Sequence, residues 1–397
     1  MTTRQRGKKT GTKKGESQSF LSGRMNRREF LEKGAKLGMA ASALGTGMLF
    51  SVPPARAAKS LKGTGEVVVC GWGGAFQDAM RETIFKPFTK ETGIKVIDTA
   101  TPNSAKVKAQ VDSGNIEWDI ALLSYLSGII LGEKYLEKID YSYFADSDYN
   151  NIPAAVRKPL SCGAYFFSYI LAYNKEKFPK GAHPGSWADF VDFDRFPDKR
   201  IFPSAVGGHH FHVEAAQMAS GVPKGKLYPP DMEKAWAFYD KLKPQCIKWW
   251  TQGAEAPQML ANGEVHMAMA YSARIQKLID EGLPIKIEWN QGELAENSWC
   301  AVKGAKNAEN AMKFMAFSCR PDIQAALANL YPYGPSNLKA VDYVKPETKP
   351  KLNTTPENFE KQVFINWDWY VSKTLDPKGK RSNREYLANK WQAWSLK

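Results

Sequence analysis

The chain has 397 residues, and its 55 Lys and Arg against 41 Asp and Glu give a formal net charge of +14. Much of that excess lies in residues 1–57, which hold 12 basic and 3 acidic side chains and leave 43 basic against 38 acidic in residues 58–397. This remaining part contains no Lys/Arg block with interleaved aromatic residues, so we expect no nucleic-acid partner. It also exceeds the size at which one core usually divides, and two lobes are expected.

The first 57 residues have the pattern of an export signal. A basic leader runs into the pair Arg27 and Arg28, followed by Phe-Leu, a Gly/Ala-rich apolar stretch at 37–52, and a small-x-small site that ends at Ala57. This order resembles a signal for the twin-arginine export machinery, with cleavage after Ala57. An ordinary secretory signal or an uncleaved anchor is the alternative. Because no Cys follows the apolar run and no later run reaches the length of a bilayer span, we expect a soluble, periplasmic product.

Five cysteines lie far apart and include no Cys-x-x-Cys pair, so neither a zinc ribbon nor a disulfide framework is indicated. They are Cys70, Cys162, Cys246, Cys300 and Cys319. Small buried hydrophobes are the favoured interpretation. One bridged pair in an oxidising compartment stays open as an alternative.

Residues 65–123 alternate between strand and helix patterns. The predicted strands are 65–72, 94–97 and 118–123, and the predicted helices are 75–92, which stops at Gly93, and 105–112. This alternation predicts an open, mostly parallel α/β sheet with helices on its faces.

The rest of the chain continues with both patterns. A long β-like run at 164–173 predicts a strand that crosses between lobes. Further strands are predicted at 266–271, 285–289 and 299–302, with helices from Ser186 and Val213 and over 231–242 and 308–319. Residues 341–397 turn Pro/Lys-rich and then helical, which we interpret as a clasp over the second lobe.

Four phrases together resemble one family. Residues 71–76, 88–96, 253–265 and 333–337 are similar, in matching order over about 65–340, to bacterial extracellular solute-binding proteins of the spermidine/putrescine type. Each phrase alone is weak, and the family binds many ligands.

The resemblance implies a two-lobed α/β fold with crossing hinge strands and a ligand cleft between the lobes. We expect a first lobe from 65–166 and 298–340, and a second lobe from 167–297 and 341–397. It also implies the substrate-binding component of an ABC transporter, a monomer whose partners are a small-molecule ligand and a permease in the inner membrane. Parallel sheets generally bind ligands at such strand ends, so pattern and resemblance indicate the same place.

Aromatic residues are the first candidates for this cleft. Trp72 stands among glycines that let the backbone approach a ligand, and its family counterpart packs on the ligand's amine or alkyl chain. Ser124 and Tyr125 end a predicted strand, while Tyr271 and Tyr333 match aromatic positions of the family. An aromatic box suits a desolvated cation, and it suits sugars or aromatic ligands too. A core Trp and a surface Tyr125 are the plain alternatives.

Carboxylate positions decide the charge of the ligand. The resemblance places Glu214 on an amine-binding carboxylate of the family, whereas two further carboxylate positions fall, with a less certain alignment, on Phe211 and on Ser298, which we retain as a ligand-binding candidate. The loss of two of three anionic contacts argues against a long polyamine. A ligand with one amine is easier to accommodate.

Arg274 follows the Tyr271 position closely and has the donor geometry to clamp a ligand carboxylate. A solvated arginine at a helix start is the alternative. If Glu214 and Arg274 both line the cleft, a zwitterion becomes attractive.

A histidine cluster invites a metal hypothesis, because imidazoles bind transition ions. His209, His210 and His212 lie in a Gly-rich loop with no carboxylate at ligand spacing. A polar loop is therefore the favoured interpretation, and we expect no metal and no cofactor.

The main rival class is an exported enzyme. The sequence lacks Gly-x-Ser-x-Gly, His-Glu-x-x-His and the Gly-x-x-x-x-Gly-Lys-Ser/Thr loop. No catalytic residue is therefore proposed. A receptor for a carboxylate, sugar or metal, and a receptor that signals to a membrane sensor, stay as further alternatives.

Overall fold

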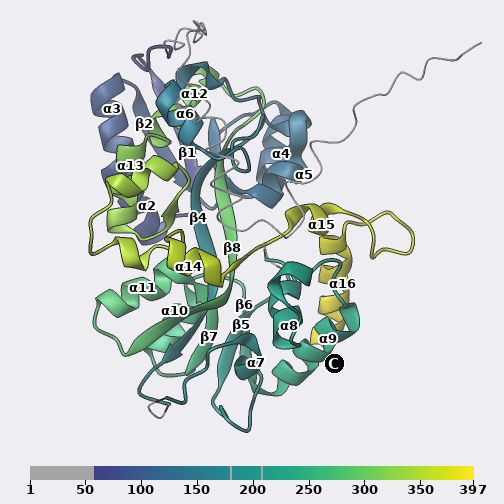
Figure 1. Cartoon of the computed structure of the whole chain (residues 1–397). Coiled ribbons are helices and arrows are strands. Elements are labelled where there is room, and N and C mark those ends of the chain that lie inside the picture. Colours follow the sequence, from purple (N-terminus) through teal and green to yellow (C-terminus); the bar gives the residue numbers. More distant parts are fainter. Residues whose placement is uncertain (1–57, 179–180, 207–208) are drawn as a thin grey trace, which may run out of the picture.

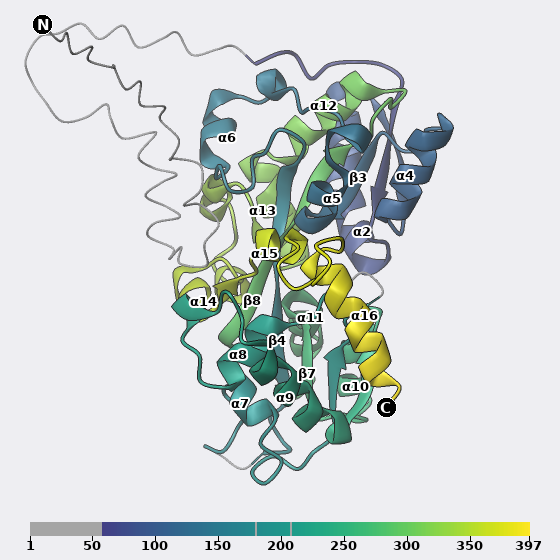
Figure 2. The ribbon, with the colours of Figure 1, turned by 90° about the vertical axis from the view of Figure 1, so that its right-hand side faces the viewer.

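The computed structural model describes residues 58–397 except 179–180 and 207–208, so the predicted export signal lies outside the described residues. The chain forms one mixed sheet with helices on both faces (Figures 1 and 2). Its strands are β1 Glu66–Gly71, β2 Lys95–Ala100, β3 Ile120–Ser124, β4 Cys162–Asn174, β5 Arg200–Pro203, β6 Cys246–Trp250, β7 Met267–Tyr271, β8 Ile285–Ala301, β9 Gly334–Pro335 and β10 Val363–Phe364. The predicted α/β two-part architecture is confirmed.

Helices cover the sheet above and below its centre. The longer ones in the upper part of Figure 1 are α2 Gly74–Met80, α3 Lys86–Thr92, α4 Ser104–Ser113, α5 Tyr125–Tyr135, α6 Asp146–Asn151, α12 Ala308–Ser318 and α13 Pro321–Leu330. Those in the lower part are α7 Trp187–Phe190, α8 Val213–Ala219, α9 Met232–Leu242, α10 Glu255–Ala261, α11 Ser272–Asp280 and α16 Asn383–Ser395, with α14 Pro356–Lys361 and α15 Trp367–Val371 between. We call these parts the upper and lower bodies. Within the described ranges, no helix combines the length and the apolar character that a bilayer span requires.

Two long antiparallel strands, β4 and β8, run through both bodies (Figure 1). The strand order is β2-β1-β3-β8-β4-β7-β5-β6, so the upper strands attach to β8 and the lower strands attach to β4. β1 pairs in parallel with β2 and β3, and β5 pairs in parallel with β6 and β7. The C-terminal ends of β3 and β7 lie opposite Asn297 of β8 and Tyr169 of β4. The C-terminal ends of both sets of parallel strands therefore point toward the middle of β4 and β8.

The first β-α-β-α-β unit follows its predicted order. Helix 75–92 appears as α2, a π-helical turn at Arg81–Phe85 and α3, and it ends at Gly93 in the left-handed conformation with φ 86°. Phe76, Ile84 and Phe88 are buried as the helical spacing predicts.

Strand β8 replaces the two separate strands predicted at 285–289 and 299–302. Gln291 takes a positive φ of 64°, and the pairing with β4 is irregular there, but the strand continues through it. Its side-chain and backbone oxygens accept hydrogen bonds from the backbone and indole N–H groups of Trp187, at 2.9 and 2.8 Å. Trp187, 104 positions away in the sequence, therefore stabilises the segment around Gln291, which the local sequence alone predicts as a break between two strands.

The C-terminal segment returns to both bodies. β10 pairs with β8, α15 packs against α5 of the upper body, and Trp394 of α16 contacts Trp236 of α9 at 6.0 Å between ring centroids. Figure 2 shows α16 running along the outside of the lower body. The segment is thus more than a clasp over one lobe.

All five cysteines are free thiols, and four of them are buried as expected of small apolar residues. Sγ of Cys162 and Sγ of Cys319 lie 3.5 Å apart, which is longer than a disulfide bond.

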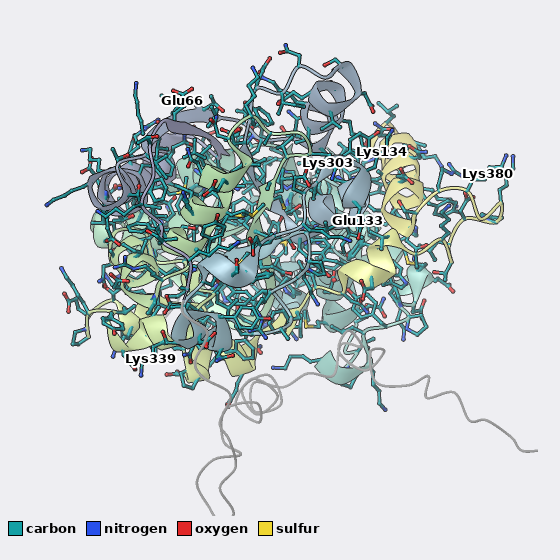
Figure 3. All side chains as sticks on the ribbon, turned by 90° about the horizontal axis from the view of Figure 1, so that it is seen from above. Glu66, Glu133, Lys134, Lys303, Lys339 and Lys380 are labelled. Carbon is teal, nitrogen blue, oxygen red and sulfur yellow. The ribbon has the colours of Figure 1, made fainter. Side chains whose placement is uncertain are left out.

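Many charged side chains lie at the periphery. Figure 3 shows Glu133, Lys134 and Lys303 on the upper body and Lys380 on the loop before α16. The ion pairs of Lys134 with Asp112 and of Lys303 with Glu137 are solvated and contribute little.

Candidate functional site

An upper aromatic group lies where α2 meets the middle of β4. It consists of Phe76, Tyr165, Tyr331 and Tyr333. The predicted ligand-binding residue Tyr333 stacks on Tyr165 with ring centroids 4.9 Å apart and an interplanar angle of 12°. Tyr333 is almost fully buried and presents a packed aromatic surface to its neighbours.

A lower aromatic group surrounds the end of β7. It consists of Phe167, Tyr169, Trp250 and Tyr271. The hydroxyls of Tyr169 and Tyr271 lie 3.2 Å apart, and Tyr271 contacts the Trp250 ring at 5.5 Å. Gly253 is required beside it, because a Cβ there would lie 2.6 Å from the Tyr271 ring. Tyr271 is therefore held in one orientation at the centre of the molecule.

Arg274 joins the two aromatic groups. It stands in the first turn of α11 and packs against Gly253, where a Cβ would lie 3.4 Å from its Nε. Burial opposes the charge, yet the nearby Tyr333, Tyr331, Tyr271 and Tyr165 raise the pKa of this guanidinium above its ordinary value. Among the described residues, no carboxylate forms an ion pair with Arg274. A partly buried cation without an anion can accept a ligand carboxylate.

Trp72 follows β1 and remains 39% exposed, which excludes the alternative of a core tryptophan. Gly73 and Gly74 after it have φ values of 73° and 60°, a conformation that side chains rarely adopt. The Gly73 N–H donates to Oε1 of Gln77 at 2.8 Å, which fixes the turn that presents the indole. A ligand can therefore reach the Trp72 ring.

Ser124 and Tyr125 lie at the start of α5. Ser124 caps the helix, with Oγ accepting from the Ser127 N–H at 3.3 Å. Burial, aided by the negative charges of Glu296 and Asp368, raises the pKa of Tyr125 to about 12. Tyr125 is therefore close to two carboxylates that local sequence gave no reason to associate with it.

Glu296 is a buried carboxyl group in the centre of β8. Burial raises its pKa to about 7, while Lys158 opposes that rise. Lys158 also lies 6.0 Å from the centre of the Tyr125 ring. Glu296 pairs in the sheet with Phe166, whereas its neighbour Asn297 pairs with Tyr165, so their side chains point to opposite faces. Tyr125 and Glu296 thus define a second, acidic locus across the strands from Arg274.

Ser298 and Asn297 offer polar atoms in the sheet. Asn297 Nδ2 donates to the Tyr165 hydroxyl at 2.9 Å, but its Oδ1 has no partner in the described structure. Oγ of Ser298 is buried without a partner as well. Ser298 lies between Leu123 and Gly163, inside the upper sheet. Its role in ligand binding stays a prediction.

Glu214 lies in the interior of the lower body with no exposed surface. The Tyr370 hydroxyl donates to Oε2 at 2.8 Å, and the Tyr228 hydroxyl donates to Oε1. Burial and the nearby Glu293 raise its pKa to about 8. Both oxygens thus have protein partners, and a bond to a ligand ammonium would have to replace one of them. Phe211 likewise packs inward, 4.1 Å from the Tyr239 ring.

Three residues near the strand crossing were missed by sequence reasoning: Glu293, Glu296 and Arg384. Arg384 of α16 donates from Nη2 to the His209 backbone oxygen at 3.2 Å, and its Nε is buried without a partner in the described structure. Burial lowers its pKa. The alternation of β8 could have marked Glu293 and Glu296 as internal, but it gives no partner for them.

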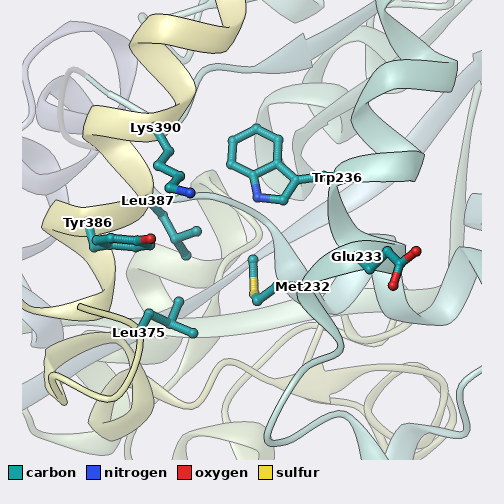
Figure 4. Close-up of a pocket in the computed structure, with 7 residues that line it drawn as sticks. All are labelled: Met232, Glu233, Trp236, Leu375, Tyr386, Leu387 and Lys390. Carbon is teal, nitrogen blue, oxygen red and sulfur yellow. The ribbon is translucent and has the colours of Figure 1, made fainter. Parts of the chain in front are cut away.

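A separate pocket of about 270 Å³ opens between α9 and the C-terminal segment (Figure 4). Its lining residues are Met232, Glu233, Trp236, Leu375, Tyr386, Leu387 and Lys390. None of the predicted ligand-binding residues lines this pocket.

Comparisons with known proteins agree with this arrangement. Residues 83–355 match the family described as bacterial extracellular solute-binding protein. The chain is 31% identical to the gamma-aminobutyric acid-binding protein of Pseudomonas aeruginosa, over 83% of this chain and 91% of that protein. It is 26% identical to the spermidine/putrescine-binding periplasmic protein of Escherichia coli, over 72% and 82% of the two chains.

A solved structure gives the same fold. The crystal structure of an ABC transporter protein from Rhodopseudomonas palustris aligns with a TM-score of 0.75 and 33% identity. The alignment covers 83% of this chain and 99% of that chain.

Proposed function

Since the chain belongs to the bacterial extracellular solute-binding proteins, and is therefore the periplasmic receptor of an ABC transporter rather than an enzyme, we propose that its ligand is a small zwitterion with one ammonium and one carboxylate. A compound such as gamma-aminobutyric acid fits this description. Two lobes, 65–166 with 298–340 and 167–297 with 341–397, would close on it.

Arg274 carries this proposal. Its guanidinium is partly buried, lies among four tyrosines drawn from both bodies, and forms no ion pair within the described residues. A carboxylate that enters between the aromatic groups would supply the missing charge and accept two parallel hydrogen bonds. A polyamine would place a further cation there instead, which is unfavourable.

Aromatic rings supply the complementary half. The exposed face of Trp72 and the lower group around Tyr271 can cover an ammonium, and each ring within about 6 Å contributes on the order of 1–2 kcal/mol. Ser124 and Tyr125 are proposed to contact the ligand from the upper body, and Ser298 and Glu214 remain candidates on the evidence of the resemblance.

Glu296 favours a second candidate, a simple amine. Its carboxyl group lies beside Tyr125 with Lys158 as its cationic neighbour, so an ammonium could pair with it. A ligand bound only there would need no carboxylate.

Calorimetry with matched ligands tests the proposal. We expect gamma-aminobutyric acid to bind more tightly than butylamine, putrescine or spermidine, because only the zwitterion engages Arg274. The order reverses if the Glu296 locus holds the amine and Arg274 stays unused. Binding of sugars or dicarboxylates alone would contradict both candidates.

We also propose export through the twin-arginine machinery with cleavage after Ala57. Replacing Arg27 and Arg28 together by Lys should retain the protein in the cytoplasm, whereas Lys13→Arg with Lys14→Arg should not. Undiminished periplasmic accumulation of the Arg-to-Lys variant would contradict this route.

A further inference from the structure

Two histidines and a glutamate meet in the interior of the lower body. His212 Nδ1 lies 2.6 Å from Glu293 Oε2, and His210 Nε2 lies 3.8 Å from the same oxygen. One nitrogen from each ring and one carboxylate oxygen all lie within 4.8 Å of one another. The loop before α8 brings the histidines, and β8 brings the carboxylate from 81 positions away.

The cluster is buried, and its carboxyl group has no strong cationic partner. His212 and Glu293 have no exposed surface, and His210 is 2% exposed. The side-chain ion-pair partners of Glu293 within the described chain are these two histidines, and no Lys or Arg joins them. Isolated buried carboxylates are costly unless a cation or a proton compensates them.

The remaining polar atoms are available. Nε2 of His210 and Nε2 of His212 are buried without a hydrogen-bond partner among the described residues. Oε1 of Glu293 accepts from the backbone N–H of Ala215 at 2.9 Å, and the backbone N–H of His212 donates to the Tyr239 hydroxyl at 2.9 Å. These second contacts hold the carboxylate and the loop in place, as is common around metal ligands.

The ligand set matches a particular class of ion. Two imidazole nitrogens and one carboxylate suit Zn²⁺, Ni²⁺ or Cu²⁺, whereas Ca²⁺ and Mg²⁺ prefer oxygen ligands alone. Bonds of about 2.1 Å in a tetrahedral site place ligand atoms roughly 3.4 Å apart. The observed 2.6 and 3.8 Å, and a widest spacing within 4.8 Å, require shifts of at most about 1.4 Å to reach that spacing.

We propose that His210, His212 and Glu293 bind one divalent transition-metal ion, with water in the fourth position. The ion would neutralise Glu293 and tie the loop before α8 to the crossing strand β8. Because the His210 and His212 rings lie 5.6 and 4.7 Å from Tyr169, the ion would also fix the lower aromatic group. The missing carboxylate that argued against a metal in the sequence is supplied by Glu293.

The test uses the untagged protein without residues 1–57, stripped with a chelator. Zn²⁺ is added both to the native protein and during refolding, since a buried site can fill only when the chain opens. We expect one bound Zn²⁺ per chain by elemental analysis after gel filtration, and a rise of a few degrees in Tm.

Three variants locate the ion. Glu293→Gln and His210→Gln should each lose the bound Zn²⁺ and the Tm rise, and His210→Gln removes a nitrogen that forms no hydrogen bond here, so it should fold. His266→Gln is the matched control, because His266 also pairs with a carboxylate, Asp198, at 2.7 Å outside the cluster. Equal Zn²⁺ binding in His210→Gln, or none in the wild type by either route, overturns the proposal. Solute affinity is measured in the same samples, so that failure of the receptor function is recognised separately.

Discussion

The interior of the lower body and the central aromatic groups both place ionisable side chains near the crossing strands, but they differ in how those groups are satisfied. Glu214 receives hydrogen bonds from Tyr228 and Tyr370, whereas Arg274 has tyrosine neighbours and no ion-pair partner in the described chain. A buried charge with protein partners stabilises the fold or adjusts its protonation. A buried charge without them is the better indicator of a ligand.

Arg274→Gln should produce the largest change and tests that comparison directly. Removing the guanidinium takes away charge-assisted hydrogen bonds, so affinity for gamma-aminobutyric acid should fall on the order of 100-fold by calorimetry. Arg381→Gln is the control, because Arg381 forms a peripheral ion pair with Asp376. An unchanged affinity in Arg274→Gln would place the ligand elsewhere.

Glu214→Gln should act on stability more than on binding. Above about pH 8, where the Glu214 carboxyl group is ionised, a glutamine offers one acceptor oxygen to two tyrosine hydroxyls, so one donor loses its partner at a cost of about 1–3 kcal/mol and Tm falls by a few degrees. Solute affinity should stay nearly constant. A tenfold or greater loss of affinity with an unchanged Tm would instead support the amine-binding role that the resemblance implies.

The same variant should alter the pH dependence of stability. Burial raises the pKa of Glu214 from 4.5 in the unfolded chain to about 8 in the folded protein. Between these pH values the folded state keeps a proton that the unfolded chain releases, so stability falls as pH rises, by at most about 1.4 kcal/mol per pH unit. Denaturant titrations of Glu214→Gln from pH 4.5 to 8 should show a shallower decline. An identical decline would assign the effect to Glu293 or Glu296.

Trp72→Ala should have the smallest effect. Loss of one partly exposed ring costs about 1 kcal/mol and should weaken binding severalfold to tenfold. Tyr343→Ala removes another exposed aromatic side chain, 55% exposed, and should leave calorimetric affinity unchanged. If both variants behave alike, Trp72 does not contact the ligand.

Local sequence patterns predicted the elements whose ends are determined by residues a few positions apart. The end of α3 at Gly93 and the capping of α7 by Ser186 follow from residues a few positions apart. The continuity of β8 through Gln291 depends on Trp187, so two strands were expected where one exists. Helix α13 was not predicted, although Pro321 occupies its first turn.

The sequence predicted those candidate site residues that can be recognised from their residue type and their position at the end of a strand. Trp72 and Tyr271 stand at the ends of β1 and β7, where the pattern placed them. Glu293 and Glu296 escaped notice because their environment comes from distant segments: His212 for Glu293 and Lys158 for Glu296. The position of Glu214 was readable, but its hydrogen bond to Tyr370, 156 residues later, was not.

That late contact also bears on synthesis. Tyr370 is synthesised 156 positions after Glu214, yet it completes the hydrogen bonds of that residue, and strand β10 completes the pairing of β8. A nascent chain that has emerged only to residue 360 therefore carries a buried acid with one hydroxyl missing and an incomplete sheet. The lower body therefore reaches its final state only after residue 370 has emerged, so its packing depends on segments far apart in the chain.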